Sequence, residues 1–306
     1  MVFSPAGVVA VPGSVRRAVK RLKALGFDAR ADESATARHQ RFAGDDDTRL
    51  ATLHRVAEAV PSVALATRGG YGLIRLMDRI DWARVRHSVE HGTAWVGYSD
   101  LTFLQLGALA HDAAGPASPG HGVSAGFWAG PMACDDFGRD DSDIGGDDVT
   151  QDCFVEAVTG ELEAVGFRTE AGFDGLEVAG RLWGGNLAVL QAMLGTRHFP
   201  KVRNGILFLE DVNEHPYRIE RVLIQLQQAG ILDQQKAIVL GAFTDYRKSP
   251  LDRGYTLKTA IAQVRSLTRT PILTGLPYGH VPTKVCLPQG RKTRLMVQGR
   301  DAFLMW

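Results

Sequence analysis

Four segments of the 306-residue chain place reactive side chains or glycines directly after short apolar runs. A serine hydroxyl becomes a nucleophile when a base lies within hydrogen-bond reach and a third group orients that base. The order Ser99, Glu210, His280 is the Ser…Asp/Glu…His order of α/β-hydrolases. The four segments are Arg68-Gly-Gly-Tyr-Gly72, Gly97-Tyr-Ser-Asp100, Glu210-Asp211 and Gly275-Leu-Pro-Tyr-Gly-His280.

The Ser99 turn also contains a donor for the negative charge that develops on an attacked carbonyl oxygen. The amide after a nucleophile at a strand-to-helix turn points to this oxygen, and here it belongs to Asp100. Glycines such as Gly69 and Gly70 let a second backbone segment approach closely. The usual elbow is G-x-S-x-G, however, and its second glycine is missing here. The pattern alone therefore leaves Ser99 as either a nucleophile or the cap of the following helix.

The other candidates also have simpler interpretations. Glu210 could be a surface or inter-loop carboxylate, and Glu214, which flanks the same predicted loop, competes with it for a catalytic role. His280 is a loop histidine, and such histidines are often inert. The glycine-rich turn lacks both the Gly-Lys-Ser/Thr ending and the G-x-G-x-x-G spacing, so it does not indicate nucleotide binding.

This chemistry requires elements that bring strand ends together. The chain alternates apolar runs with amphipathic segments, which predicts an α/β fold with a parallel sheet and helices on both faces. Ligands of such sheets bind at the carboxyl ends of the strands. The strands are expected at Val8–Val11, Val63–Ala66, Thr93–Val96, Gly205–Leu209, Lys236–Leu240 and Pro271–Thr274, with short β-like runs at Lys284–Leu287, Arg294–Gln298 and Ala302–Trp306. Helices are expected from Ser14, after Ser99, from Pro216 and over Leu257–Leu267.

Length and composition favour two domains, which we place at 1–150 and 181–306, with an insertion and crossover over 112–180. The net charge of +1 indicates neither nucleic acid nor a membrane surface as partner. Three cysteines without C-x-x-C spacing and an acidic stretch, Cys134–Asp148, that does not match an EF-hand predict no metal site. Without a long apolar run or a basic leader, a cytoplasmic location is expected.

The linked motifs resemble the LD-carboxypeptidase family of serine peptidases, and most closely the bacterial muramoyltetrapeptide carboxypeptidases of murein recycling. The resemblance implies a flavodoxin-like parallel-sheet N-terminal domain, a smaller swivelling β/α C-terminal domain, and a site at their junction. It covers nearly the whole chain. The six motifs are Arg68-Gly-Gly-Tyr-Gly72, Gly97-Tyr-Ser-Asp-Leu-Thr102, Gly130-Pro-Met132, Leu182-Trp-Gly-Gly-Asn-Leu187, Leu209-Glu-Asp-Val-Asn-Glu-His-Pro-Tyr-Arg218 and Gly275-Leu-Pro-Tyr-Gly-His280.

The same resemblance implies the roles of individual residues. Ser99, Glu210 and His280 would form the triad, and the amides of Gly70 and Asp100 would form the oxyanion hole. The family hydrolyses the L,D-peptide bond that holds the terminal D-alanine of a murein tetrapeptide, without metal or cofactor, and its members are often homodimers. A muropeptide or stem tetrapeptide is then the partner. Candidates for substrate binding are Arg68, Tyr71, Trp183 and Asn186, with Lys284 as a further candidate for a substrate carboxylate.

Two other functions stay open at this point. A microcin-immunity-type serine peptidase has a similar triad and fold, but cleaves an aminoacyl-nucleotide-like antibiotic and stacks a base on an aromatic residue such as Trp128 or Trp183. A small-molecule binding protein that has lost catalysis is the second. The stretch Ser118–Trp128 and the acidic stretch after Met132 look longer than the family needs, which leaves substrate details open.

Overall fold

The computed structural model describes residues 1–114, 125–140 and 147–306. They divide into two compact α/β units, as the alternating pattern predicts. Unit 1 comprises Met1–Leu162, Gly195–Pro200 and Pro282–Gly290, and unit 2 comprises Glu163–Leu194, Lys201–Val281 and Arg291–Trp306. The chain therefore returns to unit 1 twice after first leaving it, which the sequence pattern did not indicate.

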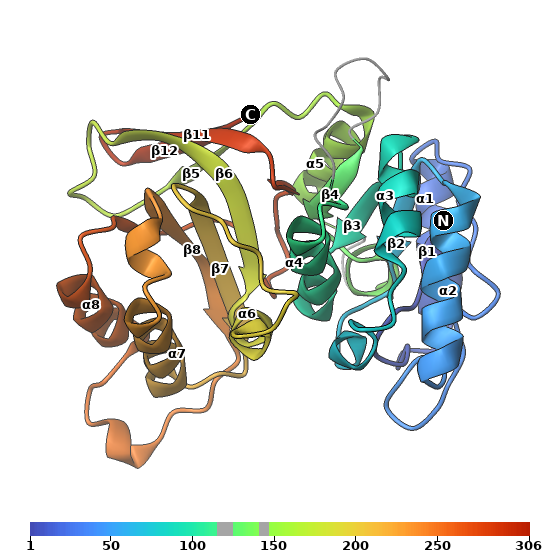
Figure 1. The fold of residues 1–306 in the computed structure, drawn as a ribbon, viewed down its shortest axis with the longest axis horizontal. Helices are drawn as coiled ribbons and strands as arrows, with labels where there is room; N and C mark the ends of the chain where they lie inside the picture. Colours follow the sequence, from blue (N-terminus) through green and yellow to red (C-terminus); the bar gives the residue numbers. More distant parts are fainter. Residues whose placement is uncertain (115–124, 141–146) are drawn as a thin grey trace. The chain divides into compact units, whose positions relative to one another are not determined.

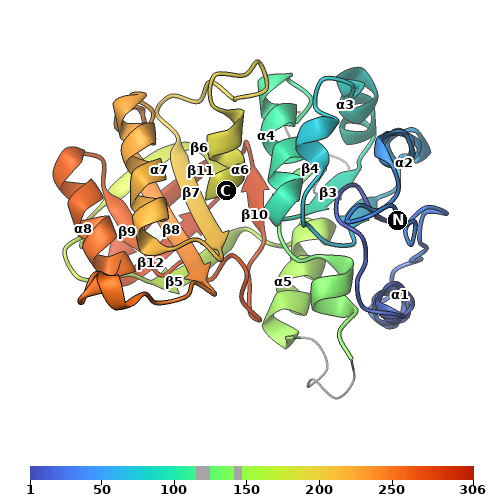
Figure 2. The same ribbon diagram turned by 90° about the horizontal axis from the view of Figure 1, so that it is seen from below.

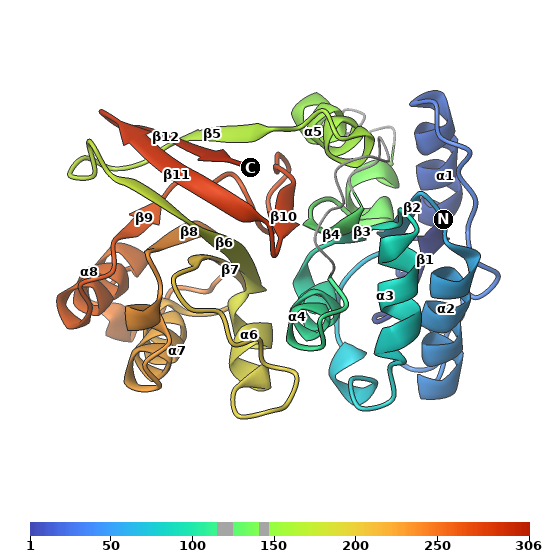
Figure 3. The same cartoon turned by 45° about the horizontal axis from the view of Figure 1, so that its top comes forward.

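Unit 1 is built on a five-stranded sheet in the order β1-β2-β3-β4-β10 (Figure 1). The first four strands are parallel, and β10 runs antiparallel to β4 (Figure 3). Their inner side chains build an aromatic core in which the Phe3 and Trp95 rings meet edge to face at 5.3 Å. The strands are β1 (Val2–Phe3), β2 (Val63–Ala66), β3 (Ala94–Gly97), β4 (Gly126–Ala129) and β10 (Leu287–Gln289).

Helices cover both faces of this sheet, with α2, α3 and α4 on one face and α1 and α5 on the other (Figure 2). Asp45 and Asp81 cap α2 and α3, because their carboxylates accept backbone N–H groups of the first turn. The helix bounds are α1 (Ser14–Ala24), α2 (Asp46–Ala59), α3 (Trp82–Glu90), α4 (Thr102–Ala110) and α5 (Asp148–Thr159), with 3₁₀ turns at Leu73–Arg75 and Ser99–Leu101 and a π-helical turn at Ala133–Phe137.

The prediction of a strand at Val8–Val11 is wrong. The first strand is Val2–Phe3, which pairs in register with Leu65 and Ala66, and Pro5 follows it. The apolar run after it is a loop that leads into α1, and its last valine is 56% exposed. An apolar run alone does not distinguish a buried strand from a loop that covers a helix end.

Unit 2 contains a seven-stranded mixed sheet in the order β5-β12-β11-β6-β7-β8-β9. Strand β6 joins its two parts, because residues 177–181 pair antiparallel with β11 and residues 182–186 pair parallel with β7. The predicted runs near 294–298 and 302–306 form the hairpin β11–β12, whereas the run at 284–287 only overlaps β10. The bounds are β5 (Ala164–Arg168), β6 (Glu177–Asn186), β7 (Ile206–Val212), β8 (Ala237–Thr244), β9 (Ile272–Thr274), β11 (Lys292–Gln298) and β12 (Asp301–Met305).

Three helices, α6 (Leu187–Met193), α7 (Pro216–Gln228) and α8 (Leu257–Leu267), lie along one face of the parallel part of this sheet (Figure 3). Pro216 opens α7, and α8 has the bounds expected from the sequence. Short 3₁₀ turns lie at Leu232–Gln234, after α7, and at Pro250–Asp252, before α8. In the described part of the chain, no helix has the length and apolar character needed to cross a bilayer.

Candidate active site

Ser99 lies in a sharp turn directly after β3, and its backbone is in the left-handed region with φ 61°. A non-glycine residue in this region is uncommon, and strained turns of this kind present nucleophiles at the top of α/β sheets. The side chain is half-buried. Neither the Ser99–Leu101 turn nor α4 has a side-chain cap, so Ser99 does not act as the helix cap that the sequence left open.

The glycine-rich loop after β2 lies against this serine within unit 1. A β-carbon on Gly69 would lie 2.4 Å from Ser99 Oγ, so only glycine fits beside the hydroxyl. The Gly69 carbonyl accepts the Gly7 N–H at 2.9 Å. Because a trans peptide directs its N–H opposite to its C=O, the Gly70 N–H points away from Gly7. In the described part of the chain, neither this N–H nor that of Asp100 has an acceptor, so both are available as donors.

The Asp100 side chain does not cap the helix that follows it. It is 3% exposed and turns back to the glycine-rich loop, where its Oδ2 accepts the Leu73 N–H at 2.9 Å and the carboxylate also accepts the Gly72 N–H. Burial raises the pKa of Asp100 to about 7, although these two amides and the nearby Arg49 oppose the shift.

The two other predicted triad members meet in unit 2. His280 Nδ1 lies 2.7 Å from Oε2 of Glu210, a carboxylate with no exposed surface. Gly279, at φ 128°, permits this approach, because a β-carbon there would lie 3.0 Å from Glu210 Oε2. The arrangement suits a carboxylate that orients an imidazole and stabilises its protonated form.

Glu210 lies inside β7 rather than after it, which corrects the predicted strand end at Leu209. The pairing of β7 with β8 shifts register between Leu209 and Asp211, and such a bulge re-aims side chains. As a result, Glu210 and its neighbour Asp211 are both buried and both accept from Asn186 Nδ2, at 3.1 and 3.0 Å. Burial, reinforced by the Glu210 charge, raises the pKa of Asp211 to about 6.

Asn186 thus holds the carboxylate pair, and its own Oδ1 caps α6 by accepting the Val189 N–H at 3.1 Å. The sequence offered Asn186 as a substrate ligand and gave Asp211 no role. A sequence signal for this pair existed: Asn186 is a polar residue at the end of β6, and Glu210 and Asp211 are consecutive carboxylates near the end of the neighbouring strand β7.

Two of the other proposed substrate ligands lie where a ligand could reach them. Tyr71 is 44% exposed, and its ring lies between that of Phe42, at 5.9 Å, and the Arg41 guanidinium, at 5.7 Å. Arg68 is half-buried and donates to the Val8 carbonyl at 3.0 Å, with its guanidinium carbon 4.0 Å from the β-carbon position of Gly70. Both therefore flank the Gly70 amide.

Three further candidates are buried. Trp183 is 1% exposed and its indole donates to Gln235 at 2.9 Å, which favours packing over substrate binding. Trp128 lies in β4 and is equally buried. The Lys284 ammonium has no exposed surface, pairs with Asp136 and lies 5.3 Å from the centre of the Tyr98 ring, so its charge is neutralised within unit 1.

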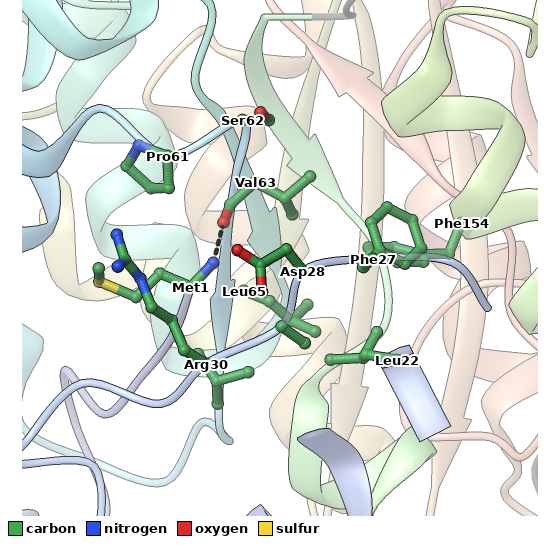
Figure 4. Close-up of a pocket in the computed structure, with 12 residues that line it drawn as sticks. Met1, Leu22, Phe27, Asp28, Arg30, Pro61, Ser62, Val63, Leu65 and Phe154 are labelled. Carbon is green, nitrogen blue, oxygen red and sulfur yellow. Dashed lines mark hydrogen bonds between the residues drawn. The ribbon is translucent and has the colours of Figure 1, made fainter. Parts of the chain in front are cut away.

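A cavity of about 270 Å³ lies at the amino ends of β1 and β2 (Figure 4). There the Met1 amine donates to the Val63 carbonyl at 2.5 Å. The cavity is thus at the opposite edge of the sheet from Ser99, which follows the carboxyl end of β3. Within the described ranges, no group of three or more His, Cys, Asp or Glu side chains could hold a metal ion. Parts of Ser118–Trp128 and of the acidic stretch after Met132 lie outside those ranges.

Comparison with known proteins shows the family to which the chain belongs. Family models described as the N-terminal and C-terminal domains of LD-carboxypeptidase match residues 1–115 and 179–295. The murein tetrapeptide carboxypeptidase of Pseudomonas aeruginosa is 28% identical over 94% of this chain and 90% of its own length. The crystal structure of muramoyltetrapeptide carboxypeptidase from Oxalobacter formigenes is 34% identical, covers 99% of this chain and 96% of that one, and superposes with a TM-score of 0.85.

The microcin C7 self-immunity protein MccF shares the fold. Its structure in complex with glutamyl sulfamoyl guanosine covers 100% of this chain and 95% of its own, with a TM-score of 0.82 at 20% identity. Sequence similarity to the Escherichia coli protein, 31%, extends over only 38% of this chain and 33% of that protein. The α/β fold with two units, predicted from the sequence, is therefore confirmed. The chain is a carboxypeptidase and belongs to the LD-carboxypeptidase family of serine peptidases.

Proposed function

We propose that this enzyme is a serine-type LD-carboxypeptidase that releases the terminal D-alanine from murein tetrapeptide, with Ser99, Glu210 and His280 as its triad. The observation that carries the proposal is the strained Ser99 turn beside two backbone amides that have no other acceptor. The Glu210–His280 pair supplies the base that such a serine needs. The substrate is inferred from the names of the relatives in Pseudomonas and Oxalobacter.

The proposed mechanism follows from these groups. His280 donates its Nδ1–H to Glu210, so its Nε2 carries the lone pair that accepts the Ser99 proton. Ser99 Oγ attacks the carbonyl carbon of the L,D-bond, and the Gly70 and Asp100 amides donate to the oxyanion. Collapse breaks the C–N bond, and the D-alanine amine leaves with the proton from His280. Water, deprotonated by His280, then attacks the ester carbon of the acyl-enzyme. The bond to Ser99 Oγ breaks, Oγ takes the proton back from His280, and the shortened peptide leaves as a carboxylate. Each oxyanion donor contributes about 3 kcal/mol to the transition state.

Mass spectrometry of synthetic tetrapeptides tests this reaction. We expect loss of D-alanine from a peptide with an L,D-bond and none from its D,D-isomer. The Ser99→Ala variant should lose turnover by roughly 10⁴-fold or more while staying folded. Ser62→Ala, at an exposed serine at the other end of the sheet, is the matched control and should retain full turnover. Full activity of Ser99→Ala would refute the proposed nucleophile.

The microcin-immunity activity is the second candidate, and the shared MccF fold favours its inclusion in the same experiment. An aminoacyl-nucleotide analogue replaces the tetrapeptide in that arm. The burial of Trp128 and Trp183 argues against either ring stacking on a base. Cleavage of the analogue with no release of D-alanine would assign this activity instead.

A further inference from the structure

The loop that carries the Gly70 amide is fixed on both sides of that residue. On one side, the Gly69 carbonyl accepts the Gly7 N–H at 2.9 Å. On the other side, the N–H groups of Gly72 and Leu73 both donate to the Asp100 side chain, the latter at 2.9 Å. The direction of the Gly70 N–H between them is therefore set by two hydrogen-bonded contacts rather than by the loop alone.

The Asp100 contact has a special position, because Asp100 also supplies the second proposed oxyanion donor. Its backbone N–H belongs to the turn that carries Ser99, whereas its carboxylate reaches across to the loop after β2. Asp100 thus connects the two proposed donors. Its backbone N–H is one of them, and its carboxylate holds the segment two and three residues after Gly70, which carries the other.

The surroundings of this contact are buried, and the cation that acts on Asp100 among the described residues is Arg49. Arg49, on α2, has no exposed surface and acts electrostatically on Asp100. Arg49 pairs with Asp46, donates to the Pro5 carbonyl at 3.2 Å and lies over the Phe42 ring at 4.9 Å. It also fills the space where a Gly72 β-carbon would be, at 2.5 Å. Arg49 therefore packs against the loop at Gly72, on the side where a side chain would otherwise lie.

We propose that the Asp100 side chain is a positioning residue for the oxyanion site, holding the Gly70 loop in register with the turn that carries Ser99. The proposal rests on the proposed function of Ser99 and of the two amides. It predicts that loss of the carboxylate lowers the chemical rate and leaves substrate affinity almost unchanged, because the oxyanion exists only in the transition state.

The ionisation of Asp100 provides an independent readout. Ionised carboxylates accept stronger hydrogen bonds than neutral groups, so protonation weakens the hold on Gly72 and Leu73. The free energy of unfolding responds to this ionisation in the opposite direction, because a buried ionised carboxylate destabilises the folded state. Since burial raises the pKa of Asp100 to about 7, its contribution to stability grows as the pH falls below 7 and is lost as the pH rises through 7. Around pH 6, activity should therefore fall while the contribution of Asp100 to stability rises. If Asp100 had a purely structural role, activity and stability would not change in opposite directions.

The experiment compares Asp100→Ala and Asp100→Asn with the full-length wild type. We expect Asp100→Ala to lower kcat by about 10²–10³-fold with KM changed by less than about threefold. Asp100→Asn keeps a neutral acceptor of the same shape, so it should be intermediate and lack the Asp100 component of the pH profile. Asp81→Ala is the matched control, because Asp81 also accepts two backbone N–H groups, at the start of α3, and its loss should leave kcat unchanged.

Amide hydrogen exchange of the segment 70–73 provides a measurement that does not depend on turnover. Exchange there should speed up in Asp100→Ala and stay unchanged in Asp81→Ala. Unchanged exchange in Asp100→Ala, or an unchanged kcat in a folded variant, would overturn the positioning role. If Asp100→Ala does not fold, the pH profile of Asp100→Asn decides, and a profile identical to that of the wild type overturns the proposal. A wild type that releases no D-alanine refutes the proposed function instead, whatever the exchange data show.

Discussion

Gly69→Ala adds one carbon atom next to Ser99 and changes none of the proposed catalytic groups. The new β-carbon would lie 2.4 Å from Ser99 Oγ, 2.5 Å from Ser99 Cβ and 3.2 Å from the Asp100 nitrogen. The hydroxyl can rotate away, but the serine β-carbon moves only with its backbone. Gly69 does not have a positive φ, so the alanine itself introduces no backbone strain.

The expected magnitude follows from these contacts. Carbon atoms in contact prefer about 3.5–4.0 Å, so the Ser99 turn and the loop must separate by about 1 Å. A misplacement of this size lowers turnover by about 100-fold, and overpacking costs about 1–3 kcal/mol of unfolding free energy. The prediction is therefore a joint loss of kcat and of stability from a single methyl group.

Denaturant unfolding and D-alanine release measure the two effects. Gly166→Ala is the matched control, since its β-carbon would meet only the Phe303 ring at an ordinary 3.4 Å. Ser99→Gly removes the two atoms in closest contact and leaves the Asp100 nitrogen at 3.2 Å, so Gly69→Ala should cost much less in that background, giving a coupling energy of about 1–3 kcal/mol. Equal destabilisation in both backgrounds would refute the packing argument, and an unchanged kcat would refute the placement of the nucleophile.

Two further experiments test the buried charged groups, one in each unit. Lys284→Met in unit 1 leaves Asp136 as a buried carboxylate without its cation, so denaturant unfolding should show a loss of about 3–5 kcal/mol. Adding Asp136→Asn should recover part of that loss, and a double variant worse than the single one would contradict the pairing. In unit 2, the pKa of Asp211, raised to about 6, means that its contribution to stability is full below about pH 4 and lost as the pH rises through 6. The difference in unfolding free energy between wild type and Asp211→Asn should therefore shift by up to about 3 kcal/mol across this range, and a pH-independent difference would exclude a titrating Asp211.

The elements that local sequence determines were predicted well. Helix α8 follows from an apolar stripe and from a start at Thr256, whose hydroxyl accepts the Thr259 N–H. Strand β6 was not predicted, because it contains three glycines, which weaken a strand pattern. Its Gly184 is required by a contact that no local pattern shows: a β-carbon there would lie 1.9 Å from the Phe208 carbonyl oxygen.

The sequence could predict which strand ends lie beside the candidate site, but it could not predict how the side chains there are buried and directed. Ser99 and His280 follow β3 and β9, where ligands of α/β sheets are expected. The burial of Glu210 together with Asp211 depends on a bulge, and the direction of the Asp100 side chain depends on Leu73, 27 residues earlier in the sequence. Both are tertiary effects that override local pattern. The expected homodimer and the expected cytoplasmic location stay predictions.

Strand β10 has a consequence for synthesis of the protein. It completes the unit 1 sheet by pairing with β4, and it comes from residues made after nearly all of unit 2. Until then β4 is an open sheet edge, which invites pairing with other chains, and Asp136 lacks its lysine. A nascent chain therefore carries an incomplete first unit while residues 163–194 and 201–281 of unit 2 are translated. Unit 1 begins the chain but finishes folding only after residue 290 has emerged.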